Sequence, residues 1–266
     1  MREDYRRKVY LSEQREVKKY LTNLFVLTLI IFSFTSLNVS IGEVLFSFPD
    51  LILFFIQNFF PPNFRNLNLQ LSAVFDTLLF AIVGTYISSF LAFFMGILLS
   101  ERLNPFPILR IFTRFFVSFL RNIPVLIWVS LLIFVFGVGN MVGLLALVLS
   151  SIGFLARSYG ESIDEIANER LEAIQATGAN LFQVLYHGVI PEFIPAWINW
   201  TLFCFEINIR ASAILGMVGA GGLGILIQTS LNLRNFREAS SLILLLIGLV
   251  LLTEIFVNVI RRWIKV

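Results

Sequence analysis

The sequence predicts an all-α integral membrane protein with about six transmembrane helices. Of its 266 residues, 58% are hydrophobic and 14% are charged, and the mean hydropathy is +0.85. A soluble domain of this length could not bury so much apolar surface. The second observation is a series of apolar runs long enough to cross about 30 Å of hydrocarbon. We expect spans near 21–37, 71–99, 123–138, 141–156, 193–215 and 240–260, with the third and fourth the shortest.

The distribution of Lys and Arg predicts the orientation in the membrane. Sixteen of the twenty lie before residue 20 or in alternate loops and their membrane edges, and only Arg65, Arg234 and Arg237 lie clearly on the other side. Because cationic loops stay in the cytoplasm, we expect both termini there. The pI near 9.2 then reflects topology. Basic residues dispersed along membrane edges do not predict nucleic-acid binding.

The chain is expected to divide into three parts. Residues 1–20 form a basic cytoplasmic tail. Residues 21–70 hold the first transmembrane helix, an uncleaved anchor, and then an aromatic segment broken by prolines, which should lie along the outer interface. Residues 71–266 form the core domain, with a cytoplasmic loop at 159–191.

Small residues recur along the second span at four-residue steps: Gly84, Ser88, Ala92 and Gly96. This interval places them on one helical face, where another backbone can approach closely. Since hydrophobicity does not drive helix association in lipid, the face is expected to be a packing seam.

The entry to the third span contains a proline. The amphipathic segment 106–120 carries Arg110 and Arg114 one turn apart and should lie on the inner surface. Pro124 then lacks an amide donor and should kink the chain. Because broken helices at membrane depth tend to line cavities, Arg121 and Asn122 are candidates for a solute pathway.

Polar residues in the fifth span are further candidates for the pathway. Asn199, Glu206 and Arg210 fall within about 40° of one another on a helix, and Asn208 lies between the two charges in sequence. Charges at this depth cost several kcal/mol unless they pair or face water. Either Glu206 and Arg210, four residues apart, neutralise each other, or they line a pathway. The two are compatible, because a paired arginine can offer an oxyanion its bidentate fork.

The segment 219–224, Gly-Ala-Gly-Gly-Leu-Gly, matches the dinucleotide-binding fingerprint literally. That fingerprint requires a preceding strand and a soluble βαβ unit, whereas this segment follows a transmembrane helix. We expect a tightly packed turn or gate on the outer side, formed by Gly219, Gly221, Gly222 and Gly224, that lets the chain skim or re-enter the membrane.

Residue types needed for catalysis are scarce. The sequence has no Walker A motif, a single cysteine, Cys204, and a single histidine, His187. We therefore expect no enzyme activity and no metal site in this chain.

The polar island at 159–191 carries the most informative spacing. Glu172-Ala173 is followed by Gly178 six residues after the Glu, and by Pro191 thirteen residues later. This pattern resembles the EAA loop of the permease subunits of ABC importers, although Ile174 and Gly188 depart from it. The resemblance implies that an ATPase subunit engages a helix near 163–178. The coupling residues would be Asp164, Glu165, Glu169, Glu172, Ala173, Gly178 and Pro191, with Gly178 ending the helix.

This loop, together with segments 121–124, 205–212 and 219–224, makes residues 71–260 similar to the permease subunits of phosphonate-type ABC importers. The resemblance implies a type I importer permease fold, a homodimeric pore in a bacterial inner membrane, and a periplasmic or lipid-anchored phosphonate-binding protein. It also implies two cytoplasmic ATP-binding subunits that hold ATP and Mg²⁺, with no cofactor in this chain. The two permeases would move as nearly rigid bodies.

Two alternatives remain open on the sequence. The first is an ABC importer permease for another small solute, as in methionine-type importers. The second is an ion-coupled secondary transporter, which would use titratable carboxylates such as Asp76, Glu206 and Glu254 and would need no ATPase.

Overall fold

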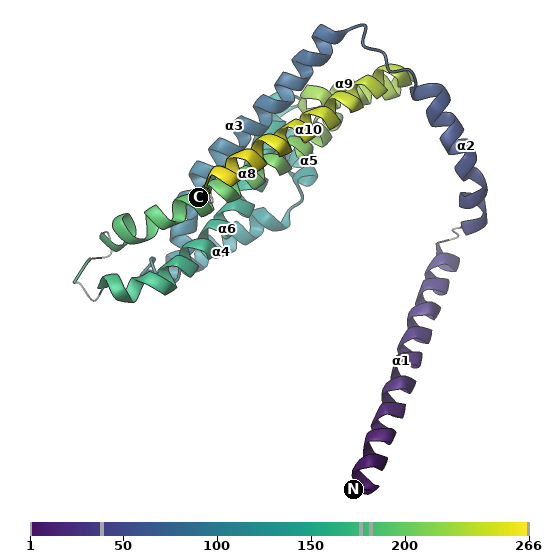
Figure 1. Cartoon of the computed structure of the whole chain (residues 1–266). Helices are drawn as coiled ribbons and strands as arrows, with labels where there is room; N and C mark the ends of the chain where they lie inside the picture. The colour runs from purple at the N-terminus through teal and green to yellow at the C-terminus, as the bar shows by residue number, and fades with distance from the viewer. Residues whose placement is uncertain (1, 38–39, 176–177, 181–182, 265–266) are drawn as a thin grey trace. The chain divides into compact units, whose positions relative to one another are not determined.

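The computed structural model describes the backbone of residues 2–37, 40–175, 178–180 and 183–264, and the side chains of these except 2–17, 41, 44 and 168–175. The described residues are helical almost throughout and contain no strand (Figure 1). This agrees with the predicted all-α class. The chain forms two compact units, Met1–Gln57 and Asn58–Val266. The predicted boundary at residues 70 and 71 falls inside a helix of the second unit, which begins at Leu67.

The first unit consists of helix α1 (Arg2–Ser36) and most of helix α2 (Ile41–Phe59). Lys18–Ser36 is apolar enough to cross a membrane, and every one of its residues is exposed. The aromatic segment expected along the outer interface is helical up to Phe59, with Pro49 inside α2, and residues 60–66 are not helical. An apolar helix with no buried residue must meet lipid or another protein, because water would solvate it poorly.

The second unit contains helices α3 (Leu67–Leu99), α4 (Pro107–Asn122), α5 (Val125–Phe136), α6 (Asn140–Gln175), α8 (Ile190–Leu215), α9 (Gly222–Asn232) and α10 (Phe236–Ile264). Two π-helical segments, η1 (Val184–Val189) and η2 (Gly216–Ala220), flank α8. Among the described residues of the chain, five helices are long and apolar enough to cross a membrane, or six if the bent pair α4–α5 counts as one span. The prediction of about six spans is therefore confirmed.

The expected third and fourth spans differ from the structure in opposite ways. Helices α4 and α5 meet at an angle of 93° around Ile123 and Pro124, so the predicted break is present. The 12 residues of α5 rise only about 18 Å. The fourth span, in contrast, is not short. It continues without interruption to Gln175, so the expected loop at 159–191 begins as the second half of α6.

Helix α6 lies at the centre of the unit and crosses α3 along the small-residue face. Gly84, Ser88, Ala92 and Gly96 are all buried, and the Ser88 hydroxyl donates to the Val148 carbonyl oxygen of α6 at 3.2 Å. A Cβ added at Gly96 would lie 2.9 Å from the Tyr159 Cβ. The two helices approach this closely because the small side chains leave room for the facing backbone.

The glycine-rich segment forms the turn between α8 and α9. Gly219, Gly221 and Gly222 have φ of 102°, 89° and 65°, which is backbone that side chains rarely adopt. A Cβ at Gly224 would lie 1.9 Å from the Ala213 carbonyl oxygen, so the turn folds back tightly on the end of α8. The amide of Leu223 donates to the Thr77 hydroxyl at 2.8 Å, which fixes the turn against α3.

Candidate functional site

The end of α6 and the η1 segment form a hairpin that extends past α3 and α4 (Figure 1). The base of the hairpin is not a separate body, because its apolar side chains join the largest core of the unit. That core contains Ile163 and Ala167 of α6, Val184 and Val189 of η1, Phe193 of α8, Leu99 at the end of α3, Leu103, and Val117 of α4. Close packing of this kind transmits displacement, so force applied to the hairpin reaches α3 and α4.

Most of the residues expected to couple to an ATPase lie on this hairpin. Asp164 and Glu165 are on α6. Glu169, Glu172 and Ala173 lie on the last turns of α6, where the side chains are outside the described part. Gly178 follows the helix with φ of 82°, and the space around it is open. Pro191 lies at the start of α8, directly after the π-helical segment η1.

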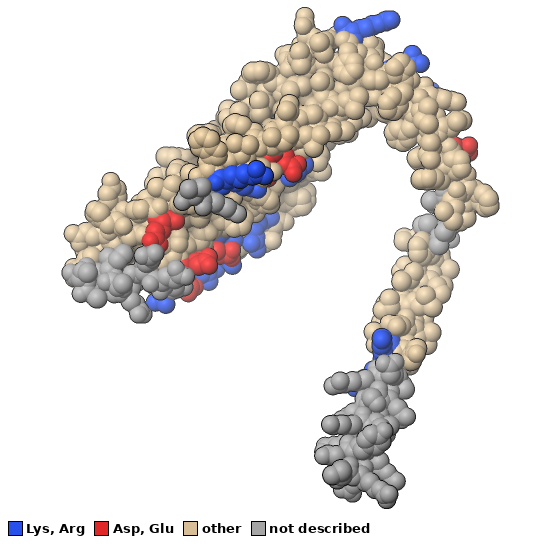
Figure 2. Space-filling model, in the orientation of Figure 1, with Lys and Arg blue, Asp and Glu red and all other residues tan. Residues whose placement is uncertain are grey.

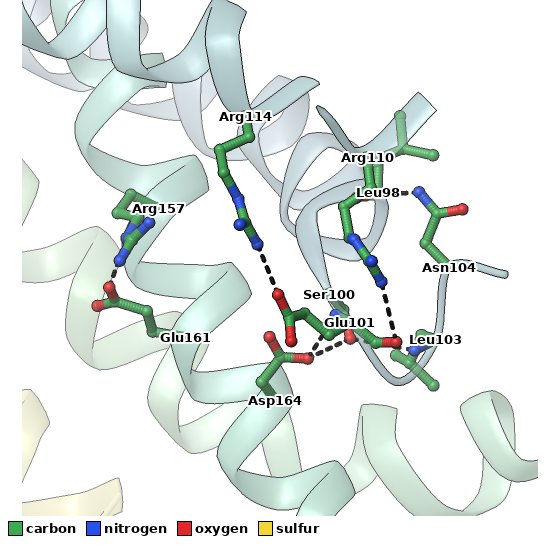
Figure 3. A network of polar contacts seen from close by, with 10 residues as sticks. All are labelled: Leu98, Ser100, Glu101, Leu103, Asn104, Arg110, Arg114, Arg157, Glu161 and Asp164. Carbon is green, nitrogen blue, oxygen red and sulfur yellow. Dashed lines mark hydrogen bonds and ion pairs between the residues drawn. The ribbon is translucent and has the colours of Figure 1, made fainter. Parts of the chain in front are cut away.

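Asp164 is turned inward and holds the connection between α3 and α4. Its Oδ1 accepts a hydrogen bond from the Ser100 hydroxyl at 2.5 Å and another from the Glu101 amide at 3.0 Å (Figure 3). The Ser100 hydroxyl oxygen in turn accepts from the Leu103 amide at 3.2 Å. Hydrogen bonds to a charged acceptor are stronger than neutral ones, so this single carboxylate fastens α6 to the turn after α3.

The Glu101 side chain extends the same contact to α4. Its carboxylate accepts from Arg114 at 2.9 Å, and its carbonyl oxygen accepts from Arg110 at 3.4 Å (Figure 3). The hydrogen bond from Arg114 and the charges of Arg110 and Arg114 hold the pKa of Glu101 below its usual value. Arg110 and Arg114 lie on the amphipathic helix expected on the inner surface, and both have a partner on the α3–α4 connection while the Arg114–Glu101 pair stays exposed.

These residues border a cavity of about 220 Å³ at the base of the hairpin. It is lined by Leu99, Glu101, Arg114, Arg157, Gly160, Glu161 and Asp164. Arg157 and Glu161 pair with each other one turn apart on α6. Because the charges of both signs are already paired across the cavity, this site is better suited to joining helices than to holding a ligand.

A second polar region lies where α8 passes the end of α10. The Glu206 carboxylate accepts from the Arg261 guanidinium at 3.3 Å, and the two side chains are only 12% and 26% exposed. Of the two alternatives left open by the sequence, mutual neutralisation of Glu206 and Arg210 is not what the structure shows, because Glu206 pairs with Arg261. Arg210 is exposed, and none of the described residues forms an ion pair with it. Figure 2 shows that most of the visible face is uncharged and that its acidic and basic side chains lie in a few small groups.

Asn199, one of the predicted pathway residues, lies near the Arg261 member of this ion pair. It lines a cavity of about 280 Å³ together with Pro195, Ala196, Arg261 and Ile264. Arg121 and Asn122 are exposed at the bend between α4 and α5, and the Arg121 backbone packs against Gly153 of α6. The structure thus places Asn199 and Arg261 in one cavity, pairs Arg261 with Glu206, and leaves Arg121 and Asn122 on another element.

Asn208 has a different environment from the other polar residues of α8. It is buried, its amide nitrogen donates to the Thr85 hydroxyl at 2.9 Å, and its amide oxygen accepts from the Ser151 hydroxyl at 3.0 Å. These bonds join α3, α6 and α8, so the side chain is occupied by helix packing and does not line the cavity beside Asn199.

Sequence reasoning missed Ser100, Glu101 and Arg261 as functional candidates. Glu206 and Arg261 are 55 residues apart, and Ser100 and Asp164 are 64 apart. The available signal was indirect: an acid at membrane depth requires a cation, and the two arginines that end the last span are within reach of such an acid.

Comparisons with a family model, with curated proteins and with solved structures all identify permease subunits of transport systems. Residues 88–266 match the family described as binding-protein-dependent transport system inner membrane component. A phosphite transport system permease of Stutzerimonas stutzeri is 31% identical over 205 residues, which cover 77% of this chain and 74% of the relative. A phosphate-import permease of Mycolicibacterium smegmatis is 33% identical over 195 residues, 73% of this chain and 37% of the relative. A solved inward-facing methionine ABC transporter shares the fold, with a TM-score of 0.67 at 24% identity over 76% of this chain and 99% of that chain.

Proposed function

Because the chain belongs to the family of binding-protein-dependent transport system inner membrane components, we propose that it is the membrane subunit of an ATP-driven importer for a phosphorus oxyanion. A protein of this family works with ATP-binding subunits and a substrate-binding protein, is integral to the inner membrane, and is itself a translocation subunit with no enzyme activity. The cargo is proposed because the relatives that match about three quarters of the chain are named for phosphite and phosphate.

The observation that carries the proposal is the hairpin of α6 and η1, whose base shares one core with α3 and α4. In this proposal the hairpin faces the cytoplasm, as do both termini, and seats in the ATPase. Closure of the ATPase around ATP and Mg²⁺ would push residues 164–178 and Pro191. The shared core and the Asp164 contacts would then tilt α3, α4 and α6 together.

The pathway is proposed to lie between two copies of the chain. Asn199, Glu206 and Arg210 share one face of α8, and a face with two charges cannot lie against lipid. A second copy of the chain that encloses a water-filled path would keep this charged face of α8 away from lipid. Arg121 and Asn122 would enter the path from the bend between α4 and α5, and the glycine turn before α9 would close its outer side.

Reconstitution with a cognate ATPase subunit and a cognate binding protein tests this proposal. Proteoliposomes should take up phosphite, phosphate or a phosphonate only when ATP and the binding protein are both present. Replacing Glu172 and Gly178 should abolish solute-stimulated ATP hydrolysis while the chain still inserts. Uptake driven by an ion gradient without the ATPase would establish the secondary transporter instead.

The methionine-type alternative is weaker. It rests on methionine import permeases that are 31–35% identical but match only 41–43% of this chain, and on a shared fold at 24% identity, which carries no information on cargo. A titration of the binding protein with methionine and with phosphite separates the two possibilities, since only the cognate solute should stabilise the binding protein against heat.

A further inference from the structure

The Arg261 guanidinium is incompletely satisfied. It carries five N–H donors, and among the described residues its side chain makes one contact, a hydrogen bond of 3.3 Å from Nη2 to Glu206. Its Nε is buried and has no acceptor. A pair held for stability alone would be expected to be bidentate and shorter. A buried donor without an acceptor is costly, so its presence in a folded protein requires an explanation.

The surroundings of Arg261 supply room for an acceptor. The cavity of about 280 Å³ is lined by Arg261 and by Asn199, whose side chain is exposed, and Pro195, Ala196 and Ile264 complete it. Several waters or one tetrahedral oxyanion fit in this volume. The apolar walls reduce the local dielectric and so strengthen attraction between a bound anion and the guanidinium.

The cavity also lies at a suitable depth. Arg261 is three residues before the end of α10, and Asn199 is on the neighbouring turn of α8. Glu206 is seven residues further along α8, or about 10 Å deeper into the membrane. The site therefore lies at the inner mouth of the pathway proposed above.

We propose that Arg261 and Asn199 form an anion-binding site for a tetrahedral phosphorus oxyanion, and that Glu206 occupies the guanidinium when the site is empty. This inference rests on the proposed function and adds a site to it. An oxyanion with two or three charged oxygens uses the guanidinium fork better than the single oxygen that Glu206 offers, so it displaces the carboxylate. When the anion leaves, Glu206 pairs with Arg261 again and keeps the buried cation from being unpaired.

The test uses the complete reconstituted transporter with radiolabelled inorganic phosphate and with methylphosphonate. Arg261→Lys keeps the charge and the ion pair but loses the fork, so KM should rise on the order of tenfold. Arg262→Gln, the exposed neighbour on the same turn, is the matched control and should leave KM unchanged. An unchanged KM for Arg261→Lys would overturn the proposal. Failure of the wild type to transport either anion would instead contradict the proposed function.

Charge reversal separates an anion site from a purely structural pair. The double variant Glu206→Arg with Arg261→Glu restores a pair of opposite charges. If the pair is purely structural, the double variant should transport the anion as the wild type does. The proposal instead predicts that the double variant does not transport the anion, although its complex with the ATPase assembles. Glu206→Gln should lower the KM of the transporter by several-fold, because the anion then has no competitor for the guanidinium.

A phospholipid headgroup also carries a phosphate group and could occupy the same site. The last experiment therefore distinguishes a lipid headgroup from a free anion. Binding of methylphosphonate by the purified complex should be equal in lipid-free detergent and in nanodiscs of phosphatidylglycerol. Binding that is seen only in detergent, and that Arg261→Lys abolishes, would assign the site to lipid and overturn the proposal.

Discussion

Asp164 on α6 and Ser100 after α3 are joined by a hydrogen bond of 2.5 Å, and the same carboxylate oxygen accepts the Glu101 amide at 3.0 Å. The hairpin thus has a polar attachment to α3 in addition to the apolar core that contains Ile163 and Leu99. An acidic residue expected to face an ATPase instead binds its own subunit. The neighbouring Glu165 is exposed and remains available to a partner.

Replacing Asp164 by Ala should lower the free energy of unfolding by about 1–3 kcal/mol, because two hydrogen bonds to a half-buried charge are lost. It should also raise the amount of ATP hydrolysed per solute transported, since the hairpin then moves without α3. Unfolding in mixed micelles and a coupling assay measure the two effects. Glu165→Ala, one residue along the same helix, is the control for stability. Equal unfolding curves for wild type and Asp164→Ala would contradict this account.

The contact between Glu101 and Arg114 predicts a pH dependence. The pKa of Glu101 is lowered in the folded state, so its contribution to stability is present above the unfolded pKa and is lost as pH falls through the folded pKa. The stability difference between wild type and Glu101→Gln should therefore persist as the pH falls to about 4.3, where an ordinary Glu is half protonated, and should vanish only below it. Loss of the difference already at pH 5 would exclude the contact. Because the pair is exposed, 0.5 M salt should weaken it.

Close helix crossing makes Gly153 intolerant of a side chain. A Cβ there would lie 2.7 Å from the Arg121 amide nitrogen and 3.0 Å from its Cα, and backbone atoms cannot move aside as a side chain can. We expect Gly153→Ala to cost about 1–3 kcal/mol through overpacking. Gly248→Ala is the matched control, since nothing lies within 4 Å of that site, and it should be neutral or stabilising by up to about 1 kcal/mol. Unfolding in mixed micelles gives the comparison, and equal effects would show that α4 and α6 are not this close.

The features that were predictable from sequence are local ones. The four-residue spacing of Gly84, Ser88, Ala92 and Gly96 decides by itself which residues share a helix face, and the structure buries all four. Pro124 marked the break before α5 because a missing donor acts on its own helix. The fourth span is longer than predicted because a run of charged residues does not by itself end a helix. No proline or glycine lies between Gly160 and Gly178, so nothing in the backbone stops α6 before Gln175.

The features that were not predictable depend on which helices pack together. Glu206 has Arg210 four residues away on the same helix, and local geometry favoured that pair. The contact between α8 and α10 brings Arg261 instead, and no periodicity in the sequence encodes that contact. The same holds for Asp164 and Ser100, which meet only after α3 and α6 have packed.

Asn199 and Asn208 should respond differently to the same substitution, although both are polar residues of one helix. Asn208→Leu removes hydrogen bonds to Thr85 and Ser151, so unfolding in mixed micelles should become easier by about 1–2 kcal/mol. KM for the transported anion should stay as in the wild type, because Asn208 is buried away from the cavity beside Arg261.

Asn199→Leu should do the reverse. Its side chain is exposed and makes no hydrogen bond with any described residue, so stability should be unchanged. Loss of one hydrogen bond to a bound anion corresponds to a KM raised about 2–10-fold. Uptake kinetics and unfolding of the two variants, measured on the same preparations, decide the matter. If Asn208→Leu raises KM while Asn199→Leu does not, the pathway runs through the interface of α3, α6 and α8, and not along the face of α8 that carries Glu206.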